Sequence, residues 1–391
     1  MHKRKKRLLV IGVLVLSLIG WFLTSPALAE EKVTVPQDAI KPKYFSQLSA
    51  TQLAQSKVTV PKSWVKESYF EKDKKEESSQ VSAFSDVNWR WGLKMINAPQ
   101  AWKYTKGEGI VVAVIGGGVN FGHPALQGKA WTNPGEVPGN GKDDDGSGYV
   151  DDVHGWDFIL NQSDSDRLHF HGNFVANLAA GNLGHSGQGG VAPRVRIMDL
   201  RVYDEDGNLG LWEDFIGAFD YALANGADII NLSVGFDYST NPSYSFFQTI
   251  RRVASEIIIV GSAGNKSSKV QPPASEEQVW AITALDRNGE IYNKSNTGQE
   301  VIFSAPGVSV SSAYGDSYHT GSGSSFAAPH VTGVVALMLS ANPDLEPREV
   351  QDILAKTARD LGPPGRDDKF GHGLVDAEAA VKKALEMKKE S

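Results

Sequence analysis

The sequence contains no cysteine among its 391 residues, which excludes disulfide bonds and thiolate metal sites. A chain of this length suffices for one large domain, which must draw its stability from its apolar core, with bound calcium as a further source. Basic residues are also in the minority, with 39 lysines and arginines against 46 aspartates and glutamates. Without an excess of positive charge, we expect no nucleic acid as a partner.

The N-terminus has the pattern of a secretory signal peptide. Basic residues 1–7 precede an apolar run over 8–23, and the small residues Ala27 and Ala29 predict cleavage after Ala29. An uncleaved membrane anchor is the alternative, but the run is short for the about 20 residues that span a bilayer. Cleavage removes five of the 39 basic residues and none of the 46 acidic ones, leaving 34 against 46 and a net charge of −12. We therefore expect a secreted, extracellular protein that is free of the membrane after signal cleavage.

Residues 30–85 are polar and aperiodic, which predicts an extended or weakly ordered arm, or a minimal pro-region. The main domain is expected over 86–385, followed by a charged tail at 386–391. The predicted strands are 109–115, 195–202, 228–232, 257–260 and 279–285, and the predicted helices are 211–225, 246–256, 325–340 and 346–359. Alternating strands and helices predict an α/β fold, a parallel sheet with helices on both faces. In such sheets the chemistry lies at the carboxyl ends of the strands.

Three polar residues in this frame could carry nucleophilic chemistry. Ser325 lies between a Gly/Ser turn and a helix start, where its own N–H and the helix dipole would face a developing oxyanion. His171, at the start of another helix, offers an imidazole whose ordinary pKa of about 6.5 suits a general base. Asn265 follows a strand and could donate its amide to an oxyanion. The alternatives are an N-cap serine, a surface histidine and a turn asparagine.

The segments around these residues resemble the subtilisin-like serine proteases, or subtilases. The family's serine block, Gly-Thr-Ser-Met-Ala-x-Pro-His, is similar to residues 323–330, Gly-Ser-Ser-Phe-Ala-Ala-Pro-His. The histidine block is similar to 171–177 and the oxyanion asparagine block to 261–265. Lesser blocks match at 191–193, 226–235, 304–307 and 371–377, so the resemblance extends from about residue 86 to 380. It implies a serine endopeptidase with Ser325 as nucleophile, His171 as base and Asn265 in the oxyanion hole.

One block departs from the family at its main residue. The aspartate block, Val-Ile-Asp-Thr-Gly-Val, is similar to residues 114–119, Val-Ile-Gly-Gly-Gly-Val, which puts Gly116 at the triad aspartate position. Three further residues, Ala125, Phe174 and Asn177, also differ from the residues that the family blocks have at these positions. A dinucleotide-binding turn is an alternative interpretation of the glycines, but it would need glycine where Phe121 stands.

The triad aspartate holds the imidazole in the right tautomer and stabilises the imidazolium. In subtilisin its removal lowers turnover about 3 × 10⁴-fold, or about 6 kcal/mol. We therefore expect a strongly impaired peptidase, with a catalytically inactive, peptide-binding or regulatory pseudoprotease as the alternative. Asp164, Asp166 and Asn120 are poorly placed to substitute for the carboxylate. We therefore expect a cavity beside the base that could take a small anion such as formate or nitrite.

Two further sites follow from the sequence. An extended peptide substrate is expected to add as a strand between two segments. Their residues are Ser233, Val234, Gly235, Asn208, Leu209 and Gly210, and the alternative is ordinary sheet edge and loop. An acidic loop has oxygen ligands at alternating positions, with glycine at the sixth, like the first part of an EF-hand calcium loop. Its residues are Asp143, Asp145, Ser147, Tyr149 and Asp151, with His154 where the closing glutamate would stand, and the alternative is a solvated turn.

Overall fold

The computed structural model describes residues 32–36, 57–61, 90–163, 168–183, 189–237, 240 and 242–390. Contacts divide the chain into two units, Met1–Phe84 and Ser85–Ser391, which are described separately. The predicted signal peptide and residues 164–167 lie outside the described residues.

The first unit contains two short strands. β1 (Lys32–Pro36) pairs antiparallel with β2 (Lys57–Pro61), with Thr34 opposite Thr59. Both strands have the sequence Lys-Val-Thr-Val-Pro, a repeat that the sequence analysis missed because it is only five residues long. This part of the predicted arm is therefore a paired β structure.

The second unit is built on a seven-stranded sheet in the order β4-β5-β3-β6-β7-β8-β9, and all of its neighbouring strands are parallel. The strands are β3 (Val111–Gly116), β4 (Gly155–Asp157), β5 (Arg196–Arg201), β6 (Ile229–Leu232), β7 (Ile258–Ser262), β8 (Val279–Leu285) and β9 (Val301–Pro306). β10 (Val310–Tyr314) and β11 (Ser317–Gly321) form a separate antiparallel pair. The α/β fold with a parallel sheet is confirmed.

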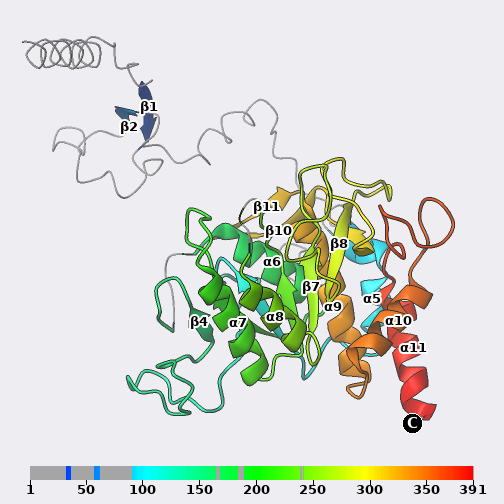
Figure 1. Cartoon of the computed structure of the whole chain (residues 1–391), viewed down its shortest axis with the longest axis horizontal. Helices are drawn as coiled ribbons and strands as arrows, with labels where there is room; N and C mark the ends of the chain where they lie inside the picture. The colour runs from blue at the N-terminus through cyan, green and yellow to red at the C-terminus, as the bar shows by residue number, and fades with distance from the viewer. Residues whose placement is uncertain are drawn as a thin grey trace, which may run out of the picture. The chain divides into compact units, whose positions relative to one another are not determined.

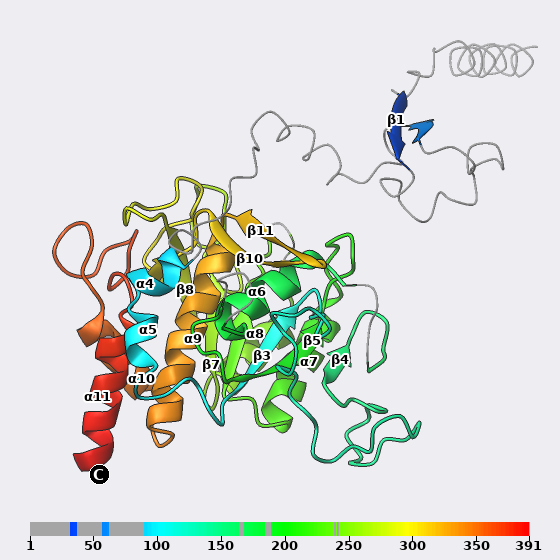
Figure 2. The same ribbon diagram turned by 180° about the vertical axis from the view of Figure 1, so that it is seen from behind.

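Helices cover both faces of the sheet, as Figures 1 and 2 show from opposite sides. They are α4 (Trp91–Met95), α5 (Ala98–Ala101), α6 (Phe170–Ala180), α7 (Trp212–Ala224), α8 (Tyr244–Val253), α9 (Ser324–Ala341), α10 (Pro347–Thr357) and α11 (Ala377–Glu390). Successive side chains of a strand point to opposite faces. Val112 and Val114 of β3 accordingly join one core with α6 and α9, whereas Ala113 and Ile115 join another with α7 and α8.

Helix boundaries follow local chemistry. α8 begins after Ser243, whose hydroxyl accepts a hydrogen bond from the Phe246 N–H at 3.2 Å, and it ends with Arg251 and Arg252 in its last turn. α11 extends to Glu390, so residues 386–390 of the expected tail continue a helix. Among the described residues, α9 is the one helix long and apolar enough to cross a membrane, and 89% of it is buried within the unit, as is usual for a core helix.

The predicted site residues meet at the carboxyl edge of the sheet because its strands are parallel. β3 ends at Gly116, Ser233 follows β6, and Asn265 comes soon after β7. α6 and α9 pack against each other, so His171 and Ser325 start two neighbouring helices.

Candidate active site

Ser325 lies in the first turn of α9, which is anchored to the loop after β7. The Asn265 side-chain oxygen accepts hydrogen bonds from the Ser324 N–H at 2.8 Å and the Ser324 hydroxyl at 3.1 Å. The Gly264 N–H donates in turn to the Ser324 hydroxyl at 3.0 Å. These bonds fix the orientation of the Asn265 amide, because its oxygen faces two donors. Its NH₂ group makes no hydrogen bond within the described part of the chain and is free to donate to an oxyanion.

His171 lies in the first turn of α6. The ring nitrogen of His169, the N-cap residue, accepts a hydrogen bond from the His171 backbone N–H at 3.3 Å. The His171 imidazole lies against the Phe326 ring, with 5.5 Å between ring centroids, and Phe326 in turn lies 4.1 Å from the Phe174 ring. Phe326 therefore contacts the imidazole directly, and Phe174 packs behind Phe326.

The partner of His171 is a tyrosine. The Tyr203 hydroxyl lies 2.9 Å from the Nδ1 atom of His171. Tyr203 is 5% exposed and stands two residues after the end of β5, which neighbours β3 in the sheet. A hydroxyl therefore stands where the resemblance leads us to expect a carboxylate.

The Tyr203 ring occupies the space beside Gly116 and Gly117. A Cβ atom on Gly116 would lie 3.6 Å from the Tyr203 hydroxyl oxygen, and one on Gly117 would lie only 2.4 Å from the ring carbon Cε2. The expected anion-binding cavity beside His171 is therefore wrong, because a side chain from the neighbouring strand fills it.

Burial keeps both partners neutral. It lowers the pKa of His171 from 6.5 to about 3, with a smaller contribution from nearby His169. Burial also raises the pKa of Tyr203, so its phenol stays protonated throughout the physiological range.

His171 and Ser325 are both partly exposed, and within the described residues they make no hydrogen bond to each other. Such contacts are often long without substrate and tighten in the reacting complex. The arrangement thus offers a serine at a helix start, a neutral imidazole and a free amide donor, and among the described residues a tyrosine hydroxyl, not a carboxylate, contacts the imidazole.

Comparison with known proteins agrees with this geometry. A sequence profile described as the subtilase family matches residues 107–373. The chain belongs to the subtilase family. It is 30% identical to the minor extracellular protease Epr of Bacillus subtilis over 78% of this chain and 45% of that protein. It is 33% identical to a thermophilic serine proteinase of Bacillus sp. strain AK1 over 72% of this chain and 65% of that protein. Subtilisin DY of Bacillus licheniformis is 32% identical over 74% of this chain and 98% of that protein.

This chain spans less than two thirds of the length of the first two of these relatives. Epr and the halolysin-like protease Nep of Natrialba magadii, two of its relatives, are named as extracellular proteases. Gly116 and Gly117, which the resemblance aligns with the aspartate and threonine of the family's aspartate block, lie beside Tyr203. Phe174 and Phe326 replace a histidine and a methionine of the blocks and stack on each other.

Asn120 makes its side-chain hydrogen bond away from His171. The Asn120 side-chain oxygen accepts from the Gly122 N–H at 2.9 Å, which closes a local turn. Asp164 and Asp166 lie outside the described residues. Sequence reasoning missed Tyr203 itself, although its place after a predicted strand, at the sheet edge that carries chemistry, was a usable signal.

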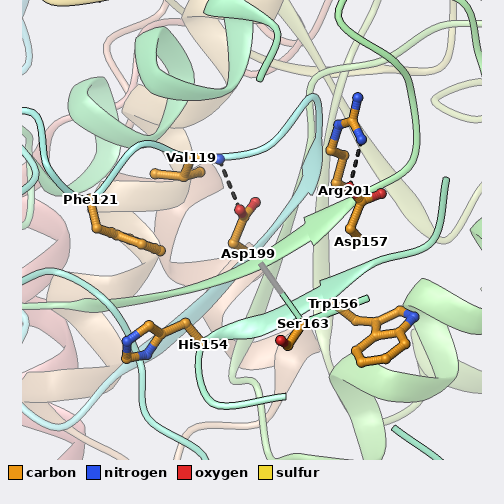
Figure 3. Close-up of a pocket in the computed structure, with 8 residues that line it drawn as sticks. All are labelled: Val119, Phe121, His154, Trp156, Asp157, Ser163, Asp199 and Arg201. Carbon is orange, nitrogen blue, oxygen red and sulfur yellow. Dashed lines mark hydrogen bonds and ion pairs between the residues drawn. The ribbon is translucent and has the colours of Figure 1, made fainter. Parts of the chain in front are cut away.

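A polar cavity of about 30 Å³ is lined by Val119 of the loop after Gly118 and by residues of β4 and β5 (Figure 3). Arg201 and Asp157 form a buried ion pair of 2.6 Å at its wall. The Val119 N–H donates to the Asp199 carboxylate at 2.9 Å and ties the loop after Gly118 to β5. The volume suits about one water molecule and no larger ligand, and the bonds in its wall hold the loop after Gly118 in place.

One of the expected substrate segments contacts Ser325, and the other pairs with the chain around Tyr203. The Ser233 hydroxyl donates to the Ser325 carbonyl at 2.8 Å, and Val234 and Gly235 continue from there. Leu209 pairs with Tyr203 in an antiparallel bridge, and the Gly210 N–H donates to the Val202 carbonyl at 2.8 Å. Asn208 completes this hairpin, since its carbonyl accepts from the Asp204 N–H at 3.0 Å.

The acidic loop gathers only part of the expected ligand set. Ligand atoms of Asp143, Asp145 and Glu136 lie within 4.8 Å of one another. Glu136 is 8% exposed, and its Oε2 atom has no hydrogen-bond partner in the described part of the chain. Glu136 lies outside the EF-hand spacing, which is why the sequence analysis missed it.

Three expected ligands have other contacts. The Asp151 carboxylate accepts from the Asn140 and Gly141 N–H groups at 3.0 and 2.8 Å. The Ser147 hydroxyl accepts from the Tyr149 N–H at 3.2 Å, and the Tyr149 ring lies 5.0 Å from Trp156. The Asp151 carboxylate lies outside the cluster of acidic ligand atoms that the described residues form. Ser147 and Tyr149 as calcium ligands stay a prediction.

Proposed function

We propose that this chain is a secreted subtilisin-like serine endopeptidase whose turnover is strongly reduced because, among the described residues, a tyrosine hydroxyl and not a carboxylate contacts its base. In this proposal the Ser325 hydroxyl attacks the peptide carbonyl and His171 takes the proton. The Asn265 amide and the Ser325 N–H receive the oxyanion. The observation that carries the proposal is the contact of His171 Nδ1 with a neutral tyrosine hydroxyl at 2.9 Å.

The expected activity is low but above background. Loss of the aspartate costs about 3 × 10⁴ in turnover in subtilisin, about 6 kcal/mol, whereas oxyanion donors and substrate binding keep about 10³–10⁴ over water. Substrates are peptides in extended conformation, aligned by backbone bonds to residues 208–210 and 233–235. Asp143, Asp145 and Glu136 are proposed to hold calcium, since carboxylate oxygens are the ligands calcium prefers.

A pseudoprotease that binds peptides without cleaving them is the second candidate. Its support is the missing His171–Ser325 hydrogen bond, together with the aromatic stack that holds the imidazole. The two candidates differ in the reactivity of Ser325. The purified mature protein is treated with a fluorophosphonate probe and a peptide substrate, beside Ser325→Ala. Slow labelling and cleavage that Ser325→Ala abolishes support the peptidase. Peptide binding with no labelling of the wild type would support the pseudoprotease.

A further inference from the structure

The Tyr203 hydroxyl has one hydrogen to donate and is almost fully buried. Within the described part of the chain, its hydrogen-bond partner is the Nδ1 atom of His171, 2.9 Å away. Because the hydroxyl is buried, its hydrogen needs an acceptor.

A neutral imidazole carries its hydrogen on either Nδ1 or Nε2. If Nδ1 carried it, Nδ1 would donate to Tyr203, and the buried hydroxyl hydrogen would have no acceptor. A buried donor without an acceptor destabilises the folded state by about the free energy of one hydrogen bond. If Nε2 carries it, both the Tyr203 hydrogen and Nδ1 are satisfied.

We propose that Tyr203 is a positioning residue that donates its hydroxyl hydrogen to His171 Nδ1 and so holds the imidazole in the Nε2–H tautomer. This inference rests on the proposed function of Ser325 and His171. A base must present a lone pair to the serine hydroxyl, but this tautomer presents an N–H instead. The site then has two deficits, because among the described residues a hydroxyl and not a carboxylate contacts the imidazole, and this hydroxyl favours the tautomer whose Nε2 cannot accept a proton. An aspartate would favour the opposite tautomer, since a carboxylate can only accept.

The tautomer can be read without any activity. Nitrogen-15 NMR of histidine-labelled protein distinguishes the protonated from the unprotonated ring nitrogen, and the signals that disappear in His171→Ala assign the residue. We expect an unprotonated Nδ1 and a protonated Nε2 at neutral pH in the wild type. In Tyr203→Phe, which keeps the ring and removes only the hydroxyl, the preference should weaken. A protonated Nδ1 in the wild type would overturn the proposal.

Reactivity provides a second test with a defined sign. Tyr203→Phe is expected to raise the fluorophosphonate labelling rate about tenfold, because the reactive tautomer becomes more populated. The matched control is Tyr221→Phe, which also removes a buried hydroxyl hydrogen bond, to Asp152, but lies away from His171. A slower rate in Tyr203→Phe alone would show that Tyr203 supports the base, which contradicts the proposal. If Ser325 labels in no variant, the proposed function fails, whereas the tautomer is still decided by NMR.

Discussion

Restoring the aspartate at position 116 should fail unless Tyr203 is changed as well. In Gly116→Asp the new Cβ atom would lie 3.6 Å from the Tyr203 hydroxyl oxygen, which itself lies 2.9 Å from His171 Nδ1. The carboxylate would have to occupy the position of that hydroxyl to reach the imidazole. We therefore expect Gly116→Asp alone to change the labelling rate of Ser325 by less than about tenfold.

The double variant Gly116→Asp with Tyr203→Leu removes the obstacle and keeps an apolar side chain in the core. Its upper limit is the full effect of the aspartate, about 10⁴ in rate or about 6 kcal/mol. The assay is the rate of fluorophosphonate labelling and of peptide cleavage in the wild type, both single variants and the double variant. Thermal unfolding of each protein controls for the packing lost at the buried position.

Two outcomes would refute this reasoning. If Gly116→Asp alone gained as much as the double variant, Tyr203 would not block the carboxylate. If the double variant folded but stayed inert, Ser325 and His171 would be misaligned for reasons beyond the missing aspartate. Ser325→Ala in the double background must abolish any gain, because the gain is attributed to that hydroxyl.

Two predictions concern stability. Calcium should raise the melting temperature by about 5 °C. Glu136→Gln should remove this effect, whereas Asp151→Asn, which lies outside the cluster, should retain it. Calorimetry with calcium and with a chelator measures the effect, and identical melting temperatures would argue against the site. His330 is 2% exposed, and burial lowers its pKa from 6.5 to about 4. Its neutral form therefore contributes stability that is complete above pH 6.5 and lost as the pH falls through 4, by about 3 kcal/mol. Denaturant unfolding at pH 7 and pH 4 should show a smaller acid loss in His330→Gln, and equal losses would contradict the assignment.

The sequence predicted the parallel sheet because its central strands are continuous apolar runs, such as 279–285, which is strand β8. The sequence did not predict β4, β10 or β11. β4 has only three residues, and β10 and β11 pair with each other outside the main sheet, so none of the three is a continuous apolar run. Ser325, His171 and Asn265 were found because each lies in a local block.

Tyr203 could not be found in that way. Its role comes from a side chain that crosses from β5 to the end of β3, and spacing along the chain carries no record of that contact. Glu136 was missed for the same reason, since it joins Asp143 and Asp145 only through the folding of the loop.

The close approach of Tyr203 to Gly117 constrains the order in which substitutions can accumulate. A side chain at 117 and the aromatic ring at 203 are mutually exclusive, because their carbons would lie 2.4 Å apart. A side chain at 117, such as the threonine of the subtilase block, therefore requires the Tyr203 ring to move or to be replaced, and we expect an aspartate at 116 to reach the histidine only under the same condition. The effects of substitutions at 116 and 117 thus depend on the residue at 203, and replacing Tyr203 is the step that has to come first.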